Sequence, residues 1–398
     1  MKQHKLHIFI LALPRFDAEV ESTSYTIARY LAKDHFVYYI DNPFTIKDYL
    51  RNRHSAQMVR RQPHFFNAAN CIIDTDLPDL KIIVPPLVGS LNFLAEGTLY
   101  RSLLKINERL VRKRVAYVLK ERGITDFIFI NSFNFHYPGL MDGLHPRLQV
   151  YHCIDPMIMP FDRKHGVVSE ALLVKKSDCV ICTARQLYEE KKKENPSTFF
   201  VPNAADITHS SKANDPALPI AAVLENIPGP RIGYLGNIER RMNYDLLGEV
   251  IRNNTGENFV FAGPNDPEYV PDWFYKLPNV FFTGSIPYAQ MPALMKGFDV
   301  AIIPFKKDAV SKTIFPLKLF EYLGAGRPVV ATDFNPDLAE FTGDTVAYCA
   351  DAASFSQAIN DALQNDTPEK RAARLQVAQQ NTWDDRVKSF YAILDRFL

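Results

Sequence analysis

The chain has 398 residues, 47% hydrophobic and 23% charged, which is enough for two or three ordinary globular domains. Its formal net charge of +1 is too close to zero to indicate an acidic or a basic partner. Its five cysteines lack the spacing of a disulfide framework, no apolar run reaches 18 residues, and the N-terminus lacks a signal-peptide pattern. We therefore expect a cytoplasmic protein with reduced thiols.

Short apolar segments alternate with helical patterns in the first half of the chain. Strands that are apolar throughout are typical of parallel sheets covered by helices on both faces. The expected strands span residues 7–13, 36–40, 81–84, 126–130, 149–154, 178–183 and 198–201. The expected helices span residues 24–33, 99–122, 169–176 and 184–193.

The loop after the first expected strand carries Arg15, Asp17 and Glu21. In doubly wound sheets, ligands bind outside the carboxyl ends of the strands. We assign these three residues to the acceptor side of a site at that edge. Ser22 and its neighbours can cap the next helix, and that role alone would also explain them.

Residues 101–122 contain eight basic and two acidic residues together with a helical apolar stripe. An apolar loop-like segment precedes them. A basic amphipathic helix beside such a loop is the pattern of a segment that lies on a membrane surface. A core helix with one solvated basic face fits the same pattern, and the sequence does not separate the two.

Residues 203–230 are rich in Pro, Ala, Ser, Asp and Asn, which predicts an interdomain linker. The first domain then spans residues 1–205 and the second begins at residue 206. A second series of strands follows at residues 231–236, 258–263, 279–284, 299–305, 327–332 and 345–350. The helices expected between them span residues 244–253, 288–296 and 354–364. The predicted fold class is α/β, with two Rossmann-like, doubly wound domains facing a cleft.

Residues 314–332, IFPLKLFEYLGAGRPVVAT, predict a short helix, a glycine break and a buried strand. Pro316 suits the first helical position, and Lys318 and Glu321 share one face. The free amides of the first turn and the Lys318 charge suit an anion, while Glu321 suits vicinal hydroxyls. Together these groups match the diphosphate and ribose of a nucleotide. An amphipathic helix with a solvated Lys–Glu pair is the alternative.

Other segments of the second half lie at the same predicted edge. Gly236 allows a ligand to approach the backbone closely, and Arg240 or Arg241 adds charge for a phosphate. We expect backbone groups around Gly263 and in residues 284–288 to recognise a base, and Tyr288 to stack on it; a ring packed at the start of its own helix is the alternative for Tyr288. The expected donor-binding residues are Gly236, Arg240, Arg241, Gly263, Ser285, Ile286, Tyr288, Phe315, Pro316, Leu317, Lys318 and Glu321.

The order of these pieces resembles the GT-B glycosyltransferases over essentially the whole chain. RIGYLGNIERRMNYDLL (231–247) resembles the opening of a GT-B donor domain, and PLKLFEYLGAGRPVVAT (316–332) resembles its diphosphate–ribose helix. QVYHCIDP (149–156) and the segment 175–206 resemble bacterial surface-polysaccharide transferases of teichuronic and xanthan-type pathways. Residues 382–394 resemble the family's helix that crosses back to the first domain. The resemblance therefore implies a second domain over 206–380 and a terminal helix over 381–398.

One position departs from the pattern of retaining members of this family. Those enzymes often carry two glutamates eight residues apart, the second at the position of Glu321, but Thr313 stands at the earlier position here. The xanthan-type glucuronosyltransferases also lack the first glutamate, keep a lysine at the position of Lys318, and invert. They place an aspartate general base in a segment like YHCIDP. The stereochemical outcome stays open.

The attacking acceptor hydroxyl must lose a proton. Asp155 ends a buried strand and is the first candidate base, because burial can raise the pKa of a carboxylate. An aspartate that caps the next turn is the alternative. His136, in NSFNFHYP, is a second candidate base.

The implied function is transfer of a sugar from a nucleotide-sugar, expected to be UDP-linked, to a carbohydrate or lipid-linked saccharide acceptor. We expect no metal and no cofactor besides this donor, because GT-B enzymes stabilise the leaving diphosphate with amides and basic side chains. A D-x-D, Asp74–Asp76, is a weak metal signal. The alternatives are a UDP-sugar 2-epimerase on the same scaffold and a non-catalytic sugar-nucleotide-binding protein. The basic helix has no aromatic interleaving, which disfavours nucleic acid.

Overall fold

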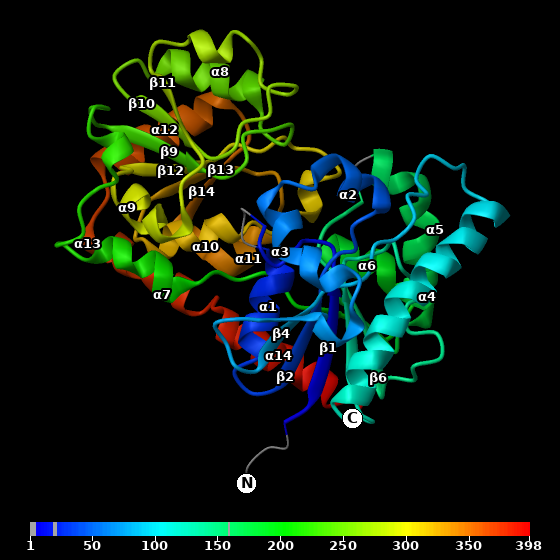
Figure 1. Cartoon of the computed structure of the whole chain (residues 1–398). Coiled ribbons are helices and arrows are strands. Elements are labelled where there is room, and N and C mark those ends of the chain that lie inside the picture. The colour runs from blue at the N-terminus through cyan, green and yellow to red at the C-terminus, as the bar shows by residue number, and fades with distance from the viewer. Residues whose placement is uncertain (1–4, 19–21, 158–159) are drawn as a thin grey trace. The chain divides into compact units, whose positions relative to one another are not determined.

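The computed structural model describes residues 5–18, 22–157 and 160–398. It contains two compact units, one made of Met1–Pro202 with Val387–Leu398 and the other of Asn203–Arg386 (Figure 1). The sequence-based boundaries at 205/206 and 380/381 lie a few residues from these.

The first unit is built on an eight-stranded sheet in the order β3-β4-β2-β1-β5-β6-β7-β8. Every neighbouring pair is parallel except β3 and β4. The strands are β1 (His7–Ala12), β2 (Phe36–Ile40), β3 (Ile72–Asp74), β4 (Leu80–Ile83), β5 (Ile128–Ser132), β6 (Leu148–Cys153), β7 (Cys179–Cys182) and β8 (Thr198–Phe200). The helices are α1 (Thr23–Leu31), α2 (Ile46–Asn52), α3 (Ala56–Phe65), α4 (Thr98–Glu121), α5 (Pro160–Lys176) and α6 (Arg185–Lys192).

The second unit is built on a six-stranded parallel sheet in the order β11-β10-β9-β12-β13-β14. Its strands are β9 (Arg231–Leu235), β10 (Asn258–Ala262), β11 (Val280–Gly284), β12 (Val300–Ile303), β13 (Val329–Thr332) and β14 (Val346–Cys349). Its helices are α7 (Ile207–Ser210), α8 (Tyr244–Asn253), α9 (Met291–Lys296), α10 (Leu317–Gly324), α11 (Leu338–Thr342), α12 (Ala352–Gln364) and α13 (Pro368–Gln379). The strand order changes direction at β9 and β12, the type of position where doubly wound sheets bind ligands.

The last helix, α14 (Trp383–Leu394), begins in the second unit and ends in the first. Its part in the first unit packs there, with the Phe390 ring edge-on to His152 and the Tyr391 hydroxyl 3.3 Å from the Asp34 carboxylate. The predicted terminal helix that returns to the first domain is therefore confirmed.

All thirteen predicted strands are present, and the differences lie in less periodic segments. β3 was not predicted, because this antiparallel edge strand has only three residues and its two isoleucines are too short a run to indicate a strand. Residues 203–230 are not an open linker. They include α7, and Asn214 bonds the Gly324 carbonyl at 2.8 Å, which fixes the segment against α10. The turn-forming residues that suggested a linker form short helical turns instead.

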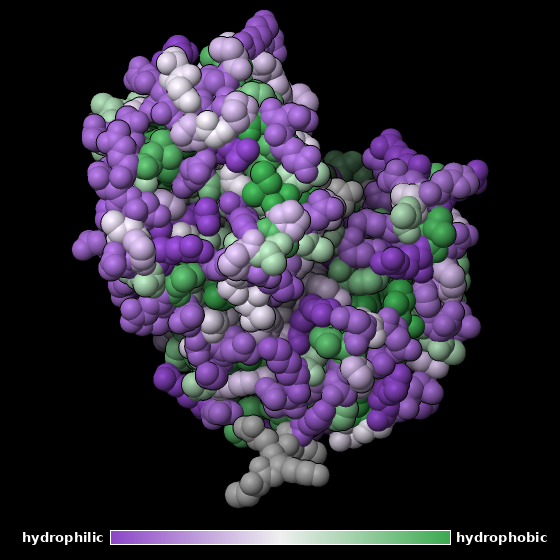
Figure 2. Space-filling view, turned by 90° about the vertical axis from the view of Figure 1, so that its left-hand side faces the viewer, coloured by the Kyte–Doolittle hydropathy of each residue, from purple (hydrophilic) through white to green (hydrophobic). Residues whose placement is uncertain are grey.

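Most large apolar side chains are in the two cores, and the face in Figure 2 is mostly hydrophilic, with hydrophobic residues in small separate patches. The core of the second unit is tightest at β9. A Cβ on Gly233 would come within 2.2 Å of the Phe298 ring, which is fully buried. Glycine is thus required here by packing.

We predict that Gly233→Ala lowers the free energy of unfolding of the second unit by about 1–3 kcal/mol, because a buried ring must move to admit one methyl group. Urea denaturation followed by circular dichroism measures the change. Gly256→Ala is the matched control, since its Cβ would meet no atom within 4 Å. Equal midpoints for the two variants would contradict the packing argument.

Candidate functional site

Three loops meet at the carboxyl edge of the second unit's sheet. They follow β9, β10 and β11 and are joined by backbone hydrogen bonds: Gly236 N–H donates to Ala262 O at 2.8 Å, and Gly263 N–H donates to Gly284 O at 2.9 Å. A Cβ on Gly263 would lie 2.2 Å from the Gly236 carbonyl oxygen. Gly236 and Gly263 both have positive φ, at 133° and 142°. The two predicted glycines therefore allow adjacent loops to touch.

Lys318 is the central side chain of this edge. It is the second residue of α10, and its Nζ donates to the Tyr234 hydroxyl at 2.8 Å. The ammonium lies 3.9 Å from the centre of the Tyr234 ring and 5.4 Å from that of Phe305. A Cβ on Gly236 would be 2.3 Å from Nζ. The lysine is thus held between two aromatic faces, directly beside the loop after β9.

This environment changes the protonation of the lysine. Burial, aided by the nearby Arg241 charge, lowers the pKa of Lys318 to about 7, while Glu239 and Glu321 act in the opposite direction. Removal from water disfavours the charged form of a lysine. A bound anion would restore the preference for the ammonium form, so the site is suited to an anionic ligand.

The loop after β9 adds two arginines and one carboxylate. Arg241 pairs closely with Glu239, and the Arg240 Nε lies 3.8 Å from the same carboxylate. Lys306 N–H donates to Arg241 O at 2.7 Å, and the Arg241 guanidinium lies 5.8 Å from the Phe305 ring. Glu239 therefore orients both predicted arginines, and the loop is fastened to the segment after β12.

Helix α10 is attached to β9 one turn beyond the lysine. The Tyr322 hydroxyl accepts from Leu235 N–H at 2.7 Å, and Tyr322 follows Lys318 by four residues, so both face the end of the strand. Glu321 belongs to the same turn and acts on the pKa of Lys318. Lys318 and Glu321, which the sequence predicted to share one face of the helix, therefore lie near each other at the same end of α10.

Two buried amide side chains hold the segment that leads into α10. Asn335 Nδ2 donates to Ile314 O at 2.9 Å, and Asn203 Nδ2 donates to Phe315 O at 3.1 Å. Pro316 is the N-cap residue, so the helix begins at Leu317 and not, as predicted, at the proline. The Phe315 ring is in the core, stacked on Phe320, because a large apolar ring is stable there. Only the backbone of Phe315 can contact a ligand.

The expected base-recognition segment follows β11. Ser285 is exposed and Ile286 half-buried, and the Tyr288 ring stacks on His209 with centroids 4.0 Å apart. His209 Nε2 also lies 2.8 Å from Tyr288 O. One face of the tyrosine ring is therefore covered by the chain, and stacking on a base stays a prediction for its other face.

The two candidate bases are in the first unit, beyond the ends of β5 and β6. Asp155 is exposed, so the burial expected for this carboxylate is not found. Burial lowers the pKa of His136 to about 4, and its Nε2 lies 3.8 Å from Asp162 Oδ1. His136 is therefore neutral at pH 7, the form in which an imidazole accepts a proton.

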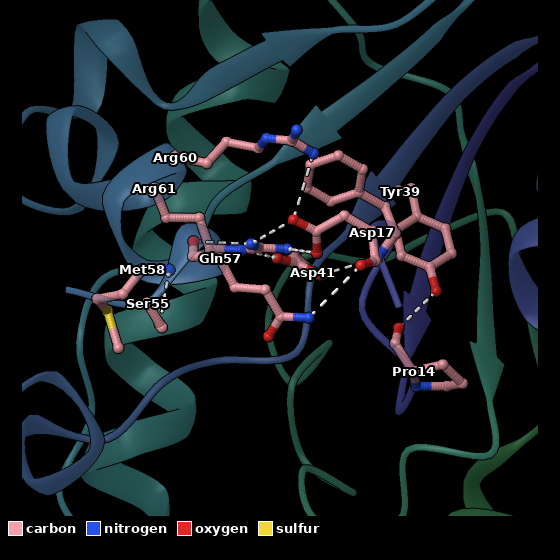
Figure 3. Close-up of polar contacts among 10 residues, drawn as sticks. Pro14, Asp17, Tyr39, Asp41, Ser55, Gln57, Met58, Arg60 and Arg61 are labelled. Carbon is pink, nitrogen blue, oxygen red and sulfur yellow. Dashed lines mark hydrogen bonds and ion pairs between the residues drawn. The ribbon is translucent and has the colours of Figure 1, made fainter. Parts of the chain in front are cut away.

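Asp17, one of the predicted acceptor-side residues, belongs to a compact ionic cluster in the first unit. Figure 3 shows Arg61 between two carboxylates: its guanidinium contacts Asp17 at 2.6 Å and Asp41 at 2.5 Å. Asp17 is thus bound by an internal partner, and it holds its loop against α3. The Arg15 guanidinium lies 3.7 Å from the Phe44 ring, and its buried Nε has no hydrogen-bond partner among the residues described. Glu21 lies outside the described residues.

The D-x-D carboxylates form two separate ion pairs. Asp74 contacts Lys81 at 2.7 Å and Asp76 contacts Arg29 at 2.8 Å. Within residues 5–18, 22–157 and 160–398, no group of three or more His, Cys, Asp or Glu side chains is arranged to hold a metal ion.

Sequence reasoning missed Tyr234 and Glu239. The first lies inside an apolar strand, RIGYL, where a tyrosine reads as core, and its burial in fact raises its pKa. Glu239 directly precedes Arg240 and Arg241. A carboxylate next to two arginines is a sequence signal for an ion pair that would orient them. The structure adds Asn203 and Asn335, whose distant positions in the chain gave no local pattern.

Part of the chain is similar in sequence to known glycosyltransferases. Residues 229–365 match the family model "Glycosyl transferases group 1". The chain is 27% identical over 216 residues to the "Putative teichuronic acid biosynthesis glycosyltransferase TuaH" of Bacillus subtilis (strain 168). That match covers 50% of this chain and 54% of the relative, so the chain spans about half the length of the relative.

Two solved structures resemble the whole chain. The UDP-forming α,α-trehalose-phosphate synthase of Burkholderia vietnamiensis has a TM-score of 0.70 at 11% identity, covering 99% of this chain and 98% of that one. HepE of Anabaena, solved in complex with UDP, has a TM-score of 0.61 at 13% identity, covering 99% and 100%. At these identities the likeness concerns the fold. Residues 229–365 are therefore similar to the group 1 glycosyltransferases, and the whole chain has the two-domain α/β fold of the GT-B structures that it resembles.

Proposed function

We propose that the protein transfers a sugar from a UDP-sugar to a carbohydrate or lipid-linked saccharide acceptor in cell-surface polysaccharide synthesis, without a metal ion. The observation that carries the proposal is the half-buried Lys318 at the start of α10, held between two aromatic rings beside Gly236. A lysine whose charge is disfavoured by burial is stabilised by an anion, and the helix start adds backbone donors.

Breaking a sugar–phosphate bond places negative charge on the departing diphosphate. In this proposal Lys318 and one of the two arginines held by Glu239 meet that charge, while the first-turn amides of α10 bind phosphate oxygens. Glu321 accepts hydrogen bonds from the ribose hydroxyls. Backbone groups after β10 and β11 read the base. The positive groups make the leaving group more stable without a metal.

The acceptor hydroxyl becomes a nucleophile by losing its proton. Asp155 is the proposed base if the reaction inverts, since its exposed carboxylate follows the end of β6. His136 is the second candidate because its imidazole is neutral. If the reaction retains configuration, the departing phosphate takes the proton and Asp155 orients the sugar.

The names of the similar proteins support the donor and the pathway. HepE was solved with UDP, and TuaH is named for teichuronic acid biosynthesis. A UDP-sugar 2-epimerase and a non-catalytic sugar-nucleotide-binding protein remain the alternatives, the latter because Thr313 replaces a usual glutamate. Thr313 is buried and bonds its own turn at Val310 O, so it offers no carboxylate to a sugar.

Association with a membrane surface is a further part of the proposal. No helix among the residues described is long and apolar enough to cross a membrane. Helix α4, which covers the predicted segment 101–122, exposes Lys105, Ile106, Arg109 and Leu110. These side chains suit an interface with lipid headgroups, where a lipid-linked acceptor would be presented.

The proposed transfer predicts a new glycosidic product when the protein is incubated with a panel of UDP-sugars and saccharide acceptors. NMR of the product identifies the sugar and the anomer. EDTA should leave the rate within about two-fold, because positive side chains replace the metal. Conversion of a UDP-sugar without any acceptor would identify the epimerase. The absence of turnover on every acceptor, with UDP still bound, would favour the binding protein.

Asp155→Asn should remove transfer and leave UDP binding unchanged if the enzyme inverts.

Lys318→Ala should weaken UDP binding by about 10- to 150-fold. This factor corresponds to the loss of one charge-assisted hydrogen bond, which contributes about 1.5–3 kcal/mol. Isothermal titration calorimetry measures the dissociation constant. Lys276→Ala is the control, because Lys276 is an exposed lysine of the same unit. Unchanged UDP affinity in the Lys318 variant, with its circular dichroism intact, would remove the phosphate assignment.

The affinity for UDP should fall as pH rises above 7. The free site has a Lys318 pKa of about 7, and a bound diphosphate raises that pKa, so binding takes up a proton in the window above 7. The second ionisation of a phosphate lies near about pH 6, so the ligand charge is constant there. The dissociation constant should rise by up to about ten-fold per pH unit from 7 to 9. A flat profile in the unmodified protein, identical to that of Lys318→Ala, would refute the coupling.

A further inference from the structure

Large hydrophobic side chains are exposed unevenly over the molecule. Of the sixteen that the described part of the chain exposes, eight lie on α4, on α5 and in the loop before α4. The eight are Phe93, Leu99, Ile106, Leu110, Phe161, Val167, Val168 and Leu172, with exposed fractions from 38% to 77%. We call the exposed surface of residues 91–113 and 160–176 the α4–α5 face.

Helix α4 contributes a row of alternating basic and apolar side chains. Lys105 and Ile106 are followed one turn later by Arg109 and Leu110 and then by Lys113, all exposed. Leu104, Val111, Val115 and Val118 of the same helix are in the core. The predicted apolar stripe is therefore mostly core, and what reaches solvent is the mixed basic and apolar row.

Helix α5 repeats this composition. Its exposed apolar residues Phe161, Val168 and Leu172 follow one another at spacings of seven and four, which places them on one side of the helix. Exposed Lys164 and Lys175 occupy the same side. A second basic and apolar row thus exists that the sequence did not suggest, because only the last part of this helix was predicted.

The two helices are in direct contact, so their rows form one surface. The Arg101 guanidinium of α4 donates to Ser169 Oγ of α5 at 2.8 Å, and the Tyr100 ring stacks on His165 with centroids 3.6 Å apart. Lys164 Nζ donates to Asn92 O at 2.8 Å, which ties the loop before α4 to the same surface. Both helices are at the right in Figure 1.

The carboxylates of this region are turned inward or paired. Glu108 is buried and accepts from Gly139 N–H, and Glu170 is buried against Lys191 and the Tyr151 hydroxyl. Glu96 binds Arg101 and His165, and Asp162 is half-buried beside His136. The charge that this face presents to solvent is therefore positive.

The same composition continues on the neighbouring α2 and α3. Among residues 46–70, the acidic residue Asp48 is half-buried in its capping box with Thr45, while Ile46, Leu50, Val59 and Phe66 are exposed. Ile46 N–H donates to Val88 O at 2.9 Å, which connects α2 to the loop before α4.

We propose that the α4–α5 face binds the surface of an anionic phospholipid bilayer, with its apolar side chains at the acyl boundary and its lysines and arginines at the headgroups. The inference deepens the proposed membrane association by naming its surface and lipid class, and it rests on that part of the proposed function. Interleaved basic and apolar side chains on paired helices match a negatively charged interface. A second copy of the chain is a poor occupant, because two positive faces repel each other.

Co-sedimentation with vesicles tests the proposal on the full-length protein, without donor or acceptor. The protein should bind vesicles of phosphatidylcholine with 30% phosphatidylglycerol and bind pure phosphatidylcholine at least about ten-fold less, since each Lys or Arg near the surface contributes about five-fold. Raising the salt to 0.5 M should weaken binding to the anionic vesicles. Equal binding to both vesicle types, or binding to neither, would overturn the proposal.

Paired variants locate the surface. Arg109→Glu with Lys113→Glu should lower binding to anionic vesicles by at least about thirty-fold, because two favourable charges become unfavourable. Lys212→Glu with Lys276→Glu makes the same change in net charge at two exposed positions of the second unit and should bind nearly as well as the unmodified protein. Val168→Ser with Leu172→Ser should weaken binding at every salt concentration, since it removes apolar insertion.

The circular dichroism spectrum and the midpoint of thermal unfolding, which should be the same in all these variants, confirm that they fold. An equal loss in the control pair would show dependence on net charge alone and would overturn the assignment to this face. Tight, saturable self-association of the unmodified protein that the Arg109 and Lys113 changes abolish, without vesicle binding, would identify a second copy as the occupant and also overturn it. If the vesicle assay fails, transfer to a water-soluble acceptor is still possible. If the transfer assay fails but vesicles are bound, the membrane binding serves some function other than the proposed transfer.

Discussion

The arrangement of the second unit depends on placing one lysine ammonium against the face of a buried tyrosine. The Lys318 ammonium lies at the end of β9 in the space that Gly236 leaves by having no Cβ, and Tyr234 offers both its ring and its hydroxyl to the charge. Tyr322 then fastens the same helix to the same strand through Leu235. A charge moved out of water needs such partners. Because they do not fully replace the lost hydration of the ammonium, a bound anion would stabilise it further.

That constraint explains why the loops around the lysine are so closely interlocked. Glu239 gathers two arginines that would otherwise repel Lys318, and the loop carrying them is bonded to the segment after β12. The close approach of Gly263 to Gly236 leaves no room for independent movement of the next loop. The positive groups are thus held in place before a ligand arrives, which lowers the entropy that binding must overcome.

The strands and the Lys318–Glu321 helix follow directly from local patterns, since apolar runs, glycine breaks and helical spacing are short-range signals. The partners of Lys318 do not, because Tyr234 looks like a core residue in its strand and its role appears only when α10 packs beside β9. Asp17 was predicted to face a substrate, yet Arg61 binds it from a helix that the sequence did not reveal. Pairings between distant segments decide which polar side chains remain available, and no local pattern encodes them. The contact between α4 and α5 is another such pairing, because the sequence of α4 alone does not show which helix lies beside it.

Asn203 has a consequence beyond holding a carbonyl. It is the first residue after the chain passes from the first unit, and its own carbonyl accepts from the Arg386 guanidinium, 3.5 Å away, at the last residue before the chain returns. Its side chain meanwhile grips Phe315 at the entrance to α10. Both covalent crossings of the polypeptide are therefore anchored to the backbone that cradles the nucleotide's phosphates in our proposal. A ligand that displaces this backbone would thus act directly on the two residues at which the chain enters and leaves the second unit.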